Sequence, residues 1–575
     1  MSPCRNLLDL DGDILHLILQ RLDAISPASI HSLVRVSRAC YRLAYPVLCR
    51  SISLPSREWW SDREKNVTQD LLNRNHEISR HVRELVMPYS LGPDGLSILT
   101  ILRILDNVQM LRSVRWHSQS KVPERLISKL EQRWPDLKLH VDVPYRSEGS
   151  LYPDIRLLSS PLLSSLECDI SWGLRDGMFG SQESVLSDIW ILAAIISQNK
   201  RLESLNLAIS GCGSGFDDDP ELEITQEVVP LDTDTLFPAG FQLPQLQEIV
   251  WPSWTYSTGI PQFEREHEKV HELTYILLKQ IPNWAHLKYL KLSGLSAELP
   301  FKQLEGCVPN LRVLHVVFRA KKYDNTPAAL SFISSLNGLE ELSIINMVAS
   351  AERCWEAIKK HKGSLCKVAV YSPPNFFIRS MGGEYAPVRK RAPLLTPEQL
   401  EELLTFRNIT DLKIDISVED AEWLTQSDIL SSTVRNEKFE NSRAAILTKF
   451  THLRRLRLNI EVHEEASLFS DGYGDPVRFE YNVAALRAAQ AKKAAVGLLK
   501  QIFANDPQSC LKEIKLKFET VALNDIISTF TPVDCSFLAT RFERDMHPGR
   551  QVQIVGNGIR FHVSSRNPQS GWVMF

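Results

Sequence analysis

The sequence predicts an α/β protein in which a short N-terminal domain of three helices, residues 1–47, precedes a long solenoid, residues 48–575. Two observations lead to this fold class. An apolar pattern, Leu-x-x-Leu-x-Leu, recurs along most of the chain and usually follows a helical stretch. The first fifty residues instead carry apolar residues at helical spacing in three short segments. We expect parallel strands on the concave face of the solenoid and helices on its convex face.

The first predicted helix spans residues 14–22 and carries one apolar stripe. A second helix should begin at Ser26-Pro27, because Ser is a good N-cap and Pro fits the first turn. A third should open at Ser37-Arg38 and stop at Pro46. Residues 48–54 then alternate apolar and polar, as a strand does.

Three helices of this length cannot bury much apolar surface by themselves. Their remaining apolar face should therefore meet either the following domain or a partner. The stripe expected to form this face contains Leu10, Ile14, Ile18 and Leu22.

The N-terminal segment resembles the F-box, a family that opens with Leu-Pro-x-Glu-Ile and continues through Ile/Leu pairs to a Val-x-Arg segment. Leu10, Asp13 and Ile14 fall on the opening motif, with Asp13 in place of Glu and Asp11 in place of Pro. Residues 36–38, Val-Ser-Arg, match the later segment.

The resemblance implies docking on the Skp-type adaptor of an SCF cullin–RING ubiquitin ligase. The stripe and the resemblance together assign adaptor binding to Leu10, Asp13, Ile14, Ile18, Leu22, Val36 and Arg38.

From about residue 80 the repeated pattern has eleven copies, whose intervening x positions are mostly polar. They occupy residues 82–87, 111–116, 202–207, 246–251, 287–292, 311–316, 339–344, 365–370, 409–414, 453–458 and 511–516. Helical stretches precede several of them, for example residues 328–338 and 397–408.

The spacing of the copies matches one repeat per turn of a solenoid. The central residues of four successive copies are Leu290, Leu314, Leu342 and Val368, which are 24, 28 and 26 residues apart. The next two steps, to Leu412 and then to Leu456, are 44 residues each, so they contain insertions or a missed repeat.

These copies resemble leucine-rich repeats, which members of the family commonly join to an F-box. No ladder of Asn or Cys follows the strands at a fixed offset, so the repeats are degenerate. Loop insertions are expected near residues 211–240, 371–395 and 461–480, which are polar or rich in Pro and Gly.

A zinc-peptidase motif, His267-Glu268-x-x-His271, offers a competing interpretation. Lys269 puts a charge in its middle, and no His follows at the metzincin offset. On a helix the two histidines would lie about 60° and 100° from Val270, at the boundary of the buried face. We therefore expect a repeat helix and no metal site.

The composition indicates which partners to expect. Net charge is −3, which gives no basic field for nucleic acid. The longest apolar run, residues 189–196, is too short for a membrane helix. The N-terminus lacks the apolar core of a secretory signal, and no cysteine pair has Cys-x-x-Cys spacing, so we expect an intracellular protein, cytoplasmic or nuclear.

The sequence leaves three functions open. The leading one is a substrate-recognition adaptor with no catalytic residue and no cofactor, whose F-box docks the ligase and whose solenoid binds a protein client. A repeat scaffold unrelated to ubiquitination and a zinc metallopeptidase are the alternatives. The client is expected to bring acidic or phosphorylated groups to a basic patch near the C-terminal end of the concave face, formed by Arg455, Arg457, Lys515 and Lys517.

Overall fold

A computed structural model describes most of the predicted repeats. The described residues are 10–25, 27–55, 62–88, 96–117, 122–142, 154–172, 196, 199–211, 242–250, 279, 281, 283–295, 299–318, 326–345, 351–371, 395–416, 443–450, 452–463, 498, 511, 513–521, 534–541, 554–555, 559–567 and 571–574. The chain divides into two compact units, one formed by Met1–Tyr256 with Ile276–Asn283 and the other by Ser257–Tyr275 with Trp284–Phe575.

The first unit begins with three helices and continues as alternating helices and strands. Its helices are α1 (Gly12–Ile25), α2 (Pro27–Leu33), α3 (Arg38–Leu48), α4 (Asp62–Leu72), α5 (Ile78–His81), α6 (Ile98–Asn107), α7 (Glu124–Arg133) and α8 (Ile155–Leu158). Its strands are β1 (Ser51–Ser53), β2 (Glu84–Val86), β3 (Ser113–Trp116), β4 (Lys138–Asp142), β5 (Leu163–Trp172), β6 (Ser204–Gly211) and β7 (Glu248–Val250). Each of these strands pairs in parallel with the next.

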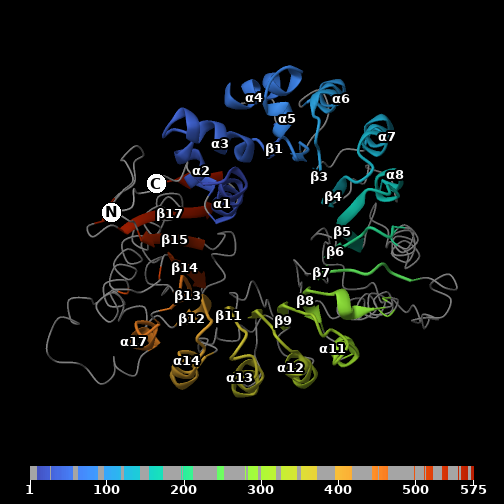
Figure 1. Ribbon diagram of the computed structural model, residues 1–575. Helices are drawn as coiled ribbons and strands as arrows, with labels where there is room; N and C mark the ends of the chain where they lie inside the picture. Colours follow the sequence, from blue (N-terminus) through green and yellow to red (C-terminus); the bar gives the residue numbers. More distant parts are fainter. Residues whose placement is uncertain are drawn as a thin grey trace, which may run out of the picture. The chain divides into compact units, whose positions relative to one another are not determined.

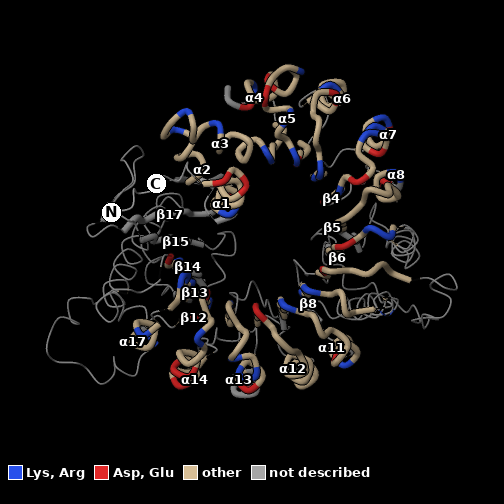
Figure 2. Tube along the Cα trace, in the orientation of Figure 1, with Lys and Arg blue, Asp and Glu red and all other residues tan. Residues whose placement is uncertain are grey.

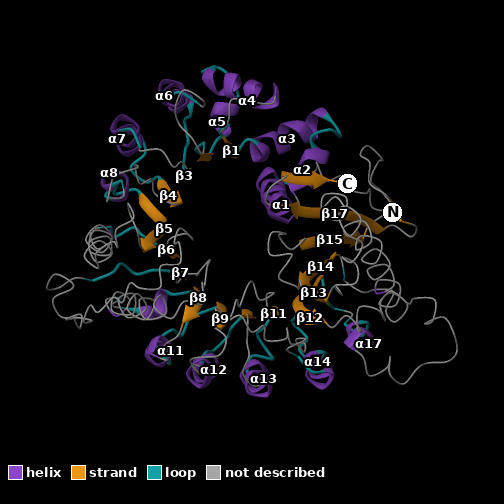
Figure 3. Cartoon of the chain, turned by 180° about the vertical axis from the view of Figure 1, so that it is seen from behind, coloured by secondary structure: helices purple, strands orange, loops and turns teal. Residues whose placement is uncertain are grey.

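The second unit continues the same alternation. Its helices are η2 (Trp284–His286), α11 (Leu299–Leu304), α12 (Thr326–Ser335), α13 (Ala351–Lys359), α14 (Pro397–Leu403) and α17 (Arg443–Leu447). Its parallel strands are β8 (Tyr289–Leu295), β9 (Val313–Phe318), β10 (Glu341–Ile345), β11 (Lys367–Tyr371), β12 (Asp411–Ile416), β13 (Arg455–His463) and β14 (Glu513–Val521). Within this unit the helices lie outside a curved row of strands (Figures 1 and 3).

The predicted fold class is confirmed, because all eleven copies of the apolar pattern coincide with parallel strands. The strand pairing also aligns the central apolar residues: Leu290 with Leu314, Leu314 with Leu342, and Leu342 with Val368. The two 44-residue steps contain insertions and no missed repeat, since β11, β12 and β13 are direct neighbours. The strands β4 and β5 carry two further repeats that the pattern did not identify.

The core of each repeat is the apolar side of its strand packed against a helix. Leu314 and Leu342 are fully buried at the centres of β9 and β10. Phe301 and Phe332, one from each of two successive helices, contact each other with ring centroids 5.9 Å apart and are also fully buried. Because one repeat alone would leave these side chains in water, stacking of neighbours stabilises the array.

Polar side chains join neighbouring repeats in place of an asparagine ladder. Asn310 donates to the carbonyl of Ala285 at 2.8 Å, and Asn408 donates to that of Gly363 at 2.7 Å. His361, almost fully buried, lies 2.8 Å from the carbonyl oxygen of Ile333. Each contact reaches a backbone carbonyl of the preceding repeat and so links the two repeats.

The three N-terminal helices match the predicted segments with one correction. Ser37 caps α3 by accepting a hydrogen bond from the amide of Cys40 at 3.1 Å. Pro46, however, does not stop this helix, which continues to Leu48. Proline removes only one amide, and the amide of Cys49 still donates to the carbonyl of Tyr45, so the last turn remains closed.

The loop insertions expected near residues 211–240, 371–395 and 461–480 lie outside the described residues except at their ends. Residues 211 and 371 are the last of β6 and β11, and residues 461–463 complete β13. Leu395 at the end of the second insertion is buried. The strands therefore extend slightly further than the pattern predicted.

The end of the second unit departs from the predicted solenoid, because its strands run antiparallel. The strands β15 (Asp534–Arg541), β16 (Ile554–Val555), β17 (Ile559–Asn567) and β18 (Gly571–Met574) follow the last parallel strand. β15 pairs antiparallel with β14 on one side and with β17 on the other.

Among the helices that the structure describes, none has both the length and the apolar composition to cross a membrane.

The turn at Gly338 requires glycine. Gly338 precedes β10 with φ of +71°, and its carbonyl accepts a hydrogen bond from Arg312 Nη1 at 3.0 Å. A Cβ there would lie 2.6 Å from the same nitrogen. We predict that Gly338→Ala lowers the free energy of unfolding by about 1–2 kcal/mol, mainly from the left-handed backbone.

Denaturant unfolding of the full chain measures this effect, with Gly363→Ala as the matched control. Gly363 occupies a turn of the same unit without a left-handed φ, and a Cβ added there would meet no described atom within 4 Å. Its variant should stay within about 0.5 kcal/mol of the original chain. Equal effects of the two substitutions would show that the left-handed backbone at Gly338 is not the cause of the destabilisation.

Candidate protein-interaction surfaces

The first candidate surface lies on α1, whose start is fixed by an aspartate. Asp11 Oδ1 accepts a hydrogen bond from the amide of Asp13 at 2.9 Å, and the carbonyl of Asp11 accepts one from the amide of Leu15 at 2.9 Å. This is the geometry of an N-cap. Asp11, which stands where the F-box pattern has Pro, therefore begins the helix by a different means.

The apolar residues of α1 divide between two faces. Leu15 and Leu19 are only 4% and 3% exposed, and Leu19 packs in a core with Ile30, Ala44 and Val47. The opposite face consists of Ile14, Leu17 and Ile18, which are 49%, 65% and 39% exposed. At about 100° per residue these three lie within an arc of about 100°.

The residues assigned to adaptor binding occupy different environments. Leu10 and Val36 are 38% and 71% exposed, and Asp13 and Arg38 are exposed as well. Leu22 differs from these residues, because it is half-buried and packs against the core of the three helices. Its angle around α1 places it with Leu15 rather than with Ile14. Leu17 is the exposed apolar residue that the predicted stripe omitted.

The second candidate surface is the polar face of strands β10–β14. The residues just before the central apolar positions form one row across neighbouring strands, in the order Glu341, Lys367, Asp411, Arg455 and Glu513. Their charges alternate in sign, so each cation has an acid on the next strand.

Ion pairs occur at both ends of this row. Glu341 lies 2.7 Å from Lys367 Nζ and 3.1 Å from His315 Nε2. Arg455 lies 3.3 Å from Asp411 and 4.0 Å from Glu513. Arg455 therefore has a carboxylate on each side, and these carboxylates would compete with an acidic group of a client.

The next row across the same strands is basic. Lys413, Arg457 and Lys515 lie opposite one another on β12, β13 and β14, about 4.8 Å apart from strand to strand. Arg457 and Lys515 are exposed, and no described acid forms an ion pair with either. Lys413 Nζ lies 3.3 Å from the centre of the Tyr371 ring. We call these three residues the basic row.

The strand register also places two other residues of the predicted patch. Lys517 pairs opposite Asn459 on β13, and its side chain lies outside the described residues. Asp415 on β12 accepts a hydrogen bond from Asn459 at 3.1 Å. Asp411 forms an ion pair with Arg455, a contact that depends on strand register and so could not be identified from sequence distance.

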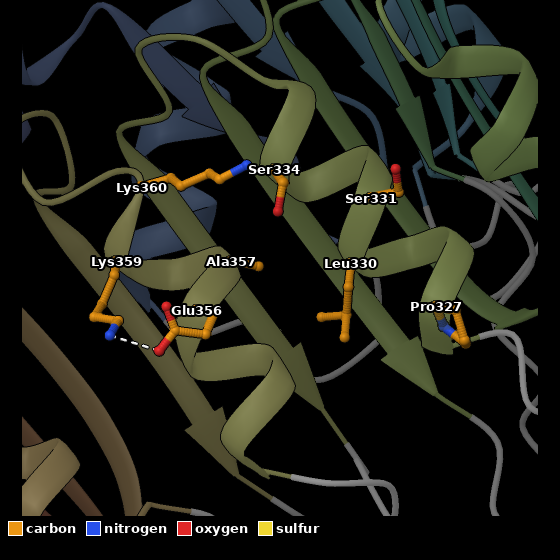
Figure 4. A pocket seen from close by; sticks show the side chains of 8 residues that line it. All are labelled: Pro327, Leu330, Ser331, Ser334, Glu356, Ala357, Lys359 and Lys360. Carbon is orange, nitrogen blue, oxygen red and sulfur yellow. Dashed lines mark ion pairs between the residues drawn. The ribbon is translucent and has the colours of Figure 1, made fainter.

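A groove on the helical side of the second unit lies between α12 and α13 (Figure 4). Its volume is about 590 Å³. Leu330 and Ala357 line it but are nearly buried, and Lys359 at its rim forms an ion pair with Glu356 at 2.5 Å. It is the furrow expected between two adjacent helices of a solenoid, and Lys359 at its rim also lies 3.8 Å from Glu402.

The zinc motif at His267, Glu268 and His271 lies outside the described residues. Among the residues that are described, no group of three His, Cys, Asp or Glu side chains is arranged to hold a metal ion. The prediction that the motif binds no metal therefore stays a prediction.

No protein-family model matches the chain, and no curated protein matches it. Among solved structures the chain is similar to one in the crystal structure of the Rad7 and Elc1 complex in yeast, with 14% sequence identity and a TM-score of 0.33. That similarity covers 81% of this chain and 91% of the other. Any function assigned to this chain therefore rests on its own residues.

The charge row predicts a pH dependence of stability. The hydrogen bond from His315, together with Lys367, lowers the pKa of Glu341 to about 2. Because the folded pKa lies below the unfolded value of about 4.3, the stabilisation is complete above that value and is lost as pH falls towards 2. We predict that Glu341→Gln lowers the free energy of unfolding by on the order of 2 kcal/mol at pH 7.

Denaturant unfolding between pH 7 and about pH 3 measures the difference between Glu341→Gln and the original chain, which should shrink below about pH 4.3. The control is Glu305→Gln, since Glu305 is an exposed carboxylate that accepts a hydrogen bond from the Ser331 hydroxyl at 2.7 Å. A difference for Glu341→Gln that stays constant with pH would rule out the electrostatic explanation.

Proposed function

We propose that this protein is a substrate-recognition adaptor of an SCF-type cullin–RING ubiquitin ligase. The observation that carries the proposal is the apolar face of α1, formed by Ile14, Leu17 and Ile18. The N-terminal helices would dock a Skp-type adaptor through this face, and the parallel-strand repeats would bind a protein client. The protein would work in the cytoplasm or nucleus.

The α1 face supports docking because its apolar side chains are concentrated. Single exposed apolar residues are common on protein surfaces and need no explanation. Here three share one arc of a single helix, while the opposite arc packs in a buried core. Removing this face from water by a partner would contribute roughly 1.5–3 kcal/mol for each fully buried side chain.

In this proposal the protein catalyses nothing and needs no cofactor. It acts by holding the client near the ligase, which raises the effective concentration of the client's lysines at the site of transfer. The repeated array supplies a broad, shaped binding surface, as solenoids commonly do.

The competing scaffold interpretation treats the three helices as a cap of the repeats. A cap would use its apolar face within the chain, as Leu15 and Leu19 do, whereas Ile14 and Leu17 remain about half or more exposed in the described structure. The peptidase interpretation depends on residues 267–271 and would be decided by measuring bound zinc in the purified protein.

For the client we propose an acidic or phosphorylated segment bound by the basic row. Arg457 and Lys515 are exposed neighbours, and arginine binds carboxylate and phosphate in a bidentate manner. Arg455 leaves the predicted set because Asp411 and Glu513 already pair with it. Lys413 joins the set through its place in the same row.

The first test substitutes the centre of the α1 face. Ile14→Asp should weaken binding to a Skp-type adaptor at least roughly thirtyfold, because losing a central apolar anchor costs about 2 kcal/mol or more. Binding is measured by calorimetry with the purified full chain. Leu99→Asp is the matched control, since Leu99 is 68% exposed on α6 and lies outside the proposed face.

The control should bind like the original chain, and circular dichroism should show that both variants are folded. Unchanged adaptor binding by a folded Ile14→Asp variant, or no binding by the original chain, would refute docking through this face.

The second test reverses the charge of the basic row with Arg457→Glu and Lys515→Glu together. Client capture should fall at least roughly tenfold, because the contacts of the client with Arg457 and Lys515 are electrostatic. For the same reason, binding of the client to the original chain should weaken as the salt concentration rises. The readout is co-precipitation of a defined client from cells, quantified at two salt concentrations. The control reverses two exposed charges of the same unit away from the row, Lys362→Glu with Arg407→Glu.

Client capture that survives the reversal of the basic row, or that falls equally in the control, would remove this surface from the proposal. Adaptor binding should be unchanged in both double variants, so the two surfaces are tested separately.

A further inference from the structure

A small cavity in the first unit is lined by basic side chains from several elements. Its volume is about 240 Å³. The polar lining consists of His16 and Gln20 from α1, His81 from α5, and Arg50, Arg83 and Arg112. The last turns of α3 provide an apolar wall. Among the described residues, no carboxylate belongs to this lining.

The three arginines occupy equivalent positions in successive repeats. Each is the residue immediately before a strand, so they precede β1, β2 and β3. The amide of Arg83 donates to the carbonyl of Arg50 at 2.8 Å, and that of Arg112 donates to the carbonyl of Arg83 at 2.7 Å. Parallel strands are about 4.8 Å apart, so the Cα atoms of the three arginines lie within about 10 Å of one another. Figure 2 shows basic segments where the chain enters the first strands.

Among the described residues, no acidic side chain separates the three arginines, Arg50, Arg83 and Arg112. In the second unit the corresponding arginine, Arg312, has Glu340 at the next position, with Arg312 Nη1 3.8 Å from Glu340 Oε1. In the first unit the nearby Glu84 is held by Arg115 at 2.6 Å. The three arginines are therefore left without an intervening carboxylate in the described residues.

The environment of Arg83 reflects this concentration of charge. Its guanidinium donates to the carbonyls of Arg80 and Val82 at 2.9 and 3.2 Å, which fix its position without cancelling its charge. Burial lowers the pKa of Arg83, and the neighbouring Arg112 and Arg50 lower it further. A negative ion in the cavity would offset both unfavourable effects by its attraction to the guanidinium groups.

One ring nitrogen in the lining also lacks a hydrogen bond. His81 Nε2 is enclosed and has no hydrogen-bond partner in the described structure. The nearest carboxylate oxygen, Glu77 Oε1, is 3.5 Å away, and Glu77 is largely exposed. A ligand oxygen in the cavity would be a suitable partner for this nitrogen.

We propose that this cavity binds a compact tetrahedral oxyanion, namely phosphate or the phosphate group of a small monoester. Arginine forks match the oxygens of phosphate, and three of them suit a doubly charged ion better than a carboxylate. The volume is below the roughly 300–1,000 Å³ typical of drug-sized ligands, so a whole nucleotide would not be enclosed. The site is separate from the exposed face of α1 and does not depend on the proposed function.

Calorimetric titration of the full-length chain with inorganic phosphate, at constant ionic strength, tests the proposal. The expected result is saturable binding below about 10 mM and a thermal midpoint that rises with phosphate but not with chloride. A parallel titration with O-phosphoserine distinguishes a site for the free ion from one that also accepts a monoester.

The deciding variant is Arg50→Gln with Arg112→Gln, whose side chains have no described ion pair to lose. Phosphate affinity should fall at least about tenfold, because each lost charged hydrogen bond contributes that much. Without phosphate, the variant's thermal midpoint should equal or exceed that of the original chain, since repulsion is relieved. A purely structural role of the arginines would lower it.

Arg125→Gln is the matched control, because Arg125 is an exposed arginine of the same unit on α7. It should bind phosphate as the original chain does. The proposal fails if the original chain shows no saturable phosphate binding, or if the Arg50/Arg112 variant binds phosphate as tightly as the control.

Discussion

The alignment of central apolar residues across parallel strands is the constraint on which the other features depend. Leu314, Leu342 and Val368 are directly opposite one another, and a shift by one residue would turn all three towards solvent. This register fixes which polar residues become neighbours. It also tolerates insertions, since the 44-residue steps give the same pairing as steps of 24 to 28 residues. Longer loops cost little extra entropy when the paired strands remain buried.

The sequence was sufficient to predict the repeats but not every strand. All eleven predicted copies are strands because each keeps its apolar residues on one side. β5 was missed because Cys168 stands where the pattern has its last Leu, and β4 because the apolar residues around Leu139 simply alternate. The antiparallel strands from Asp534 onwards contain no copy of the Leu-x-x-Leu-x-Leu pattern, so they gave no repeat signal. The sequence predicted that the third helix ends at Pro46, but α3 continues for two more residues to Leu48, because one missing amide does not unwind a turn.

The candidate surfaces were only partly predictable, for a physical reason. Helical spacing identified Ile14 and Ile18 but could not separate them from Leu22, since the division of α1 into two faces depends on where α2 and α3 pack. Likewise the sequence shows the charges of Arg455, Arg457 and Lys515 without their partners. The register brings Asp411 and Glu513 beside Arg455 and leaves Arg457 between two cations. Whether a charge is available to a ligand is decided by neighbours far away in sequence.

The reversal of strand direction at β15 has a consequence for assembly. An open edge of a parallel sheet presents unpaired amides and carbonyls, to which the edge of another molecule can add. In the second unit β15 occupies that edge of β14, and it runs the opposite way. A strand from another copy of this protein therefore cannot extend the parallel array beyond β14 as though it were one more repeat. The last edge strand that the structure describes in this unit, β18, pairs antiparallel with β17, so any strand added there would extend an antiparallel segment and not the repeat array.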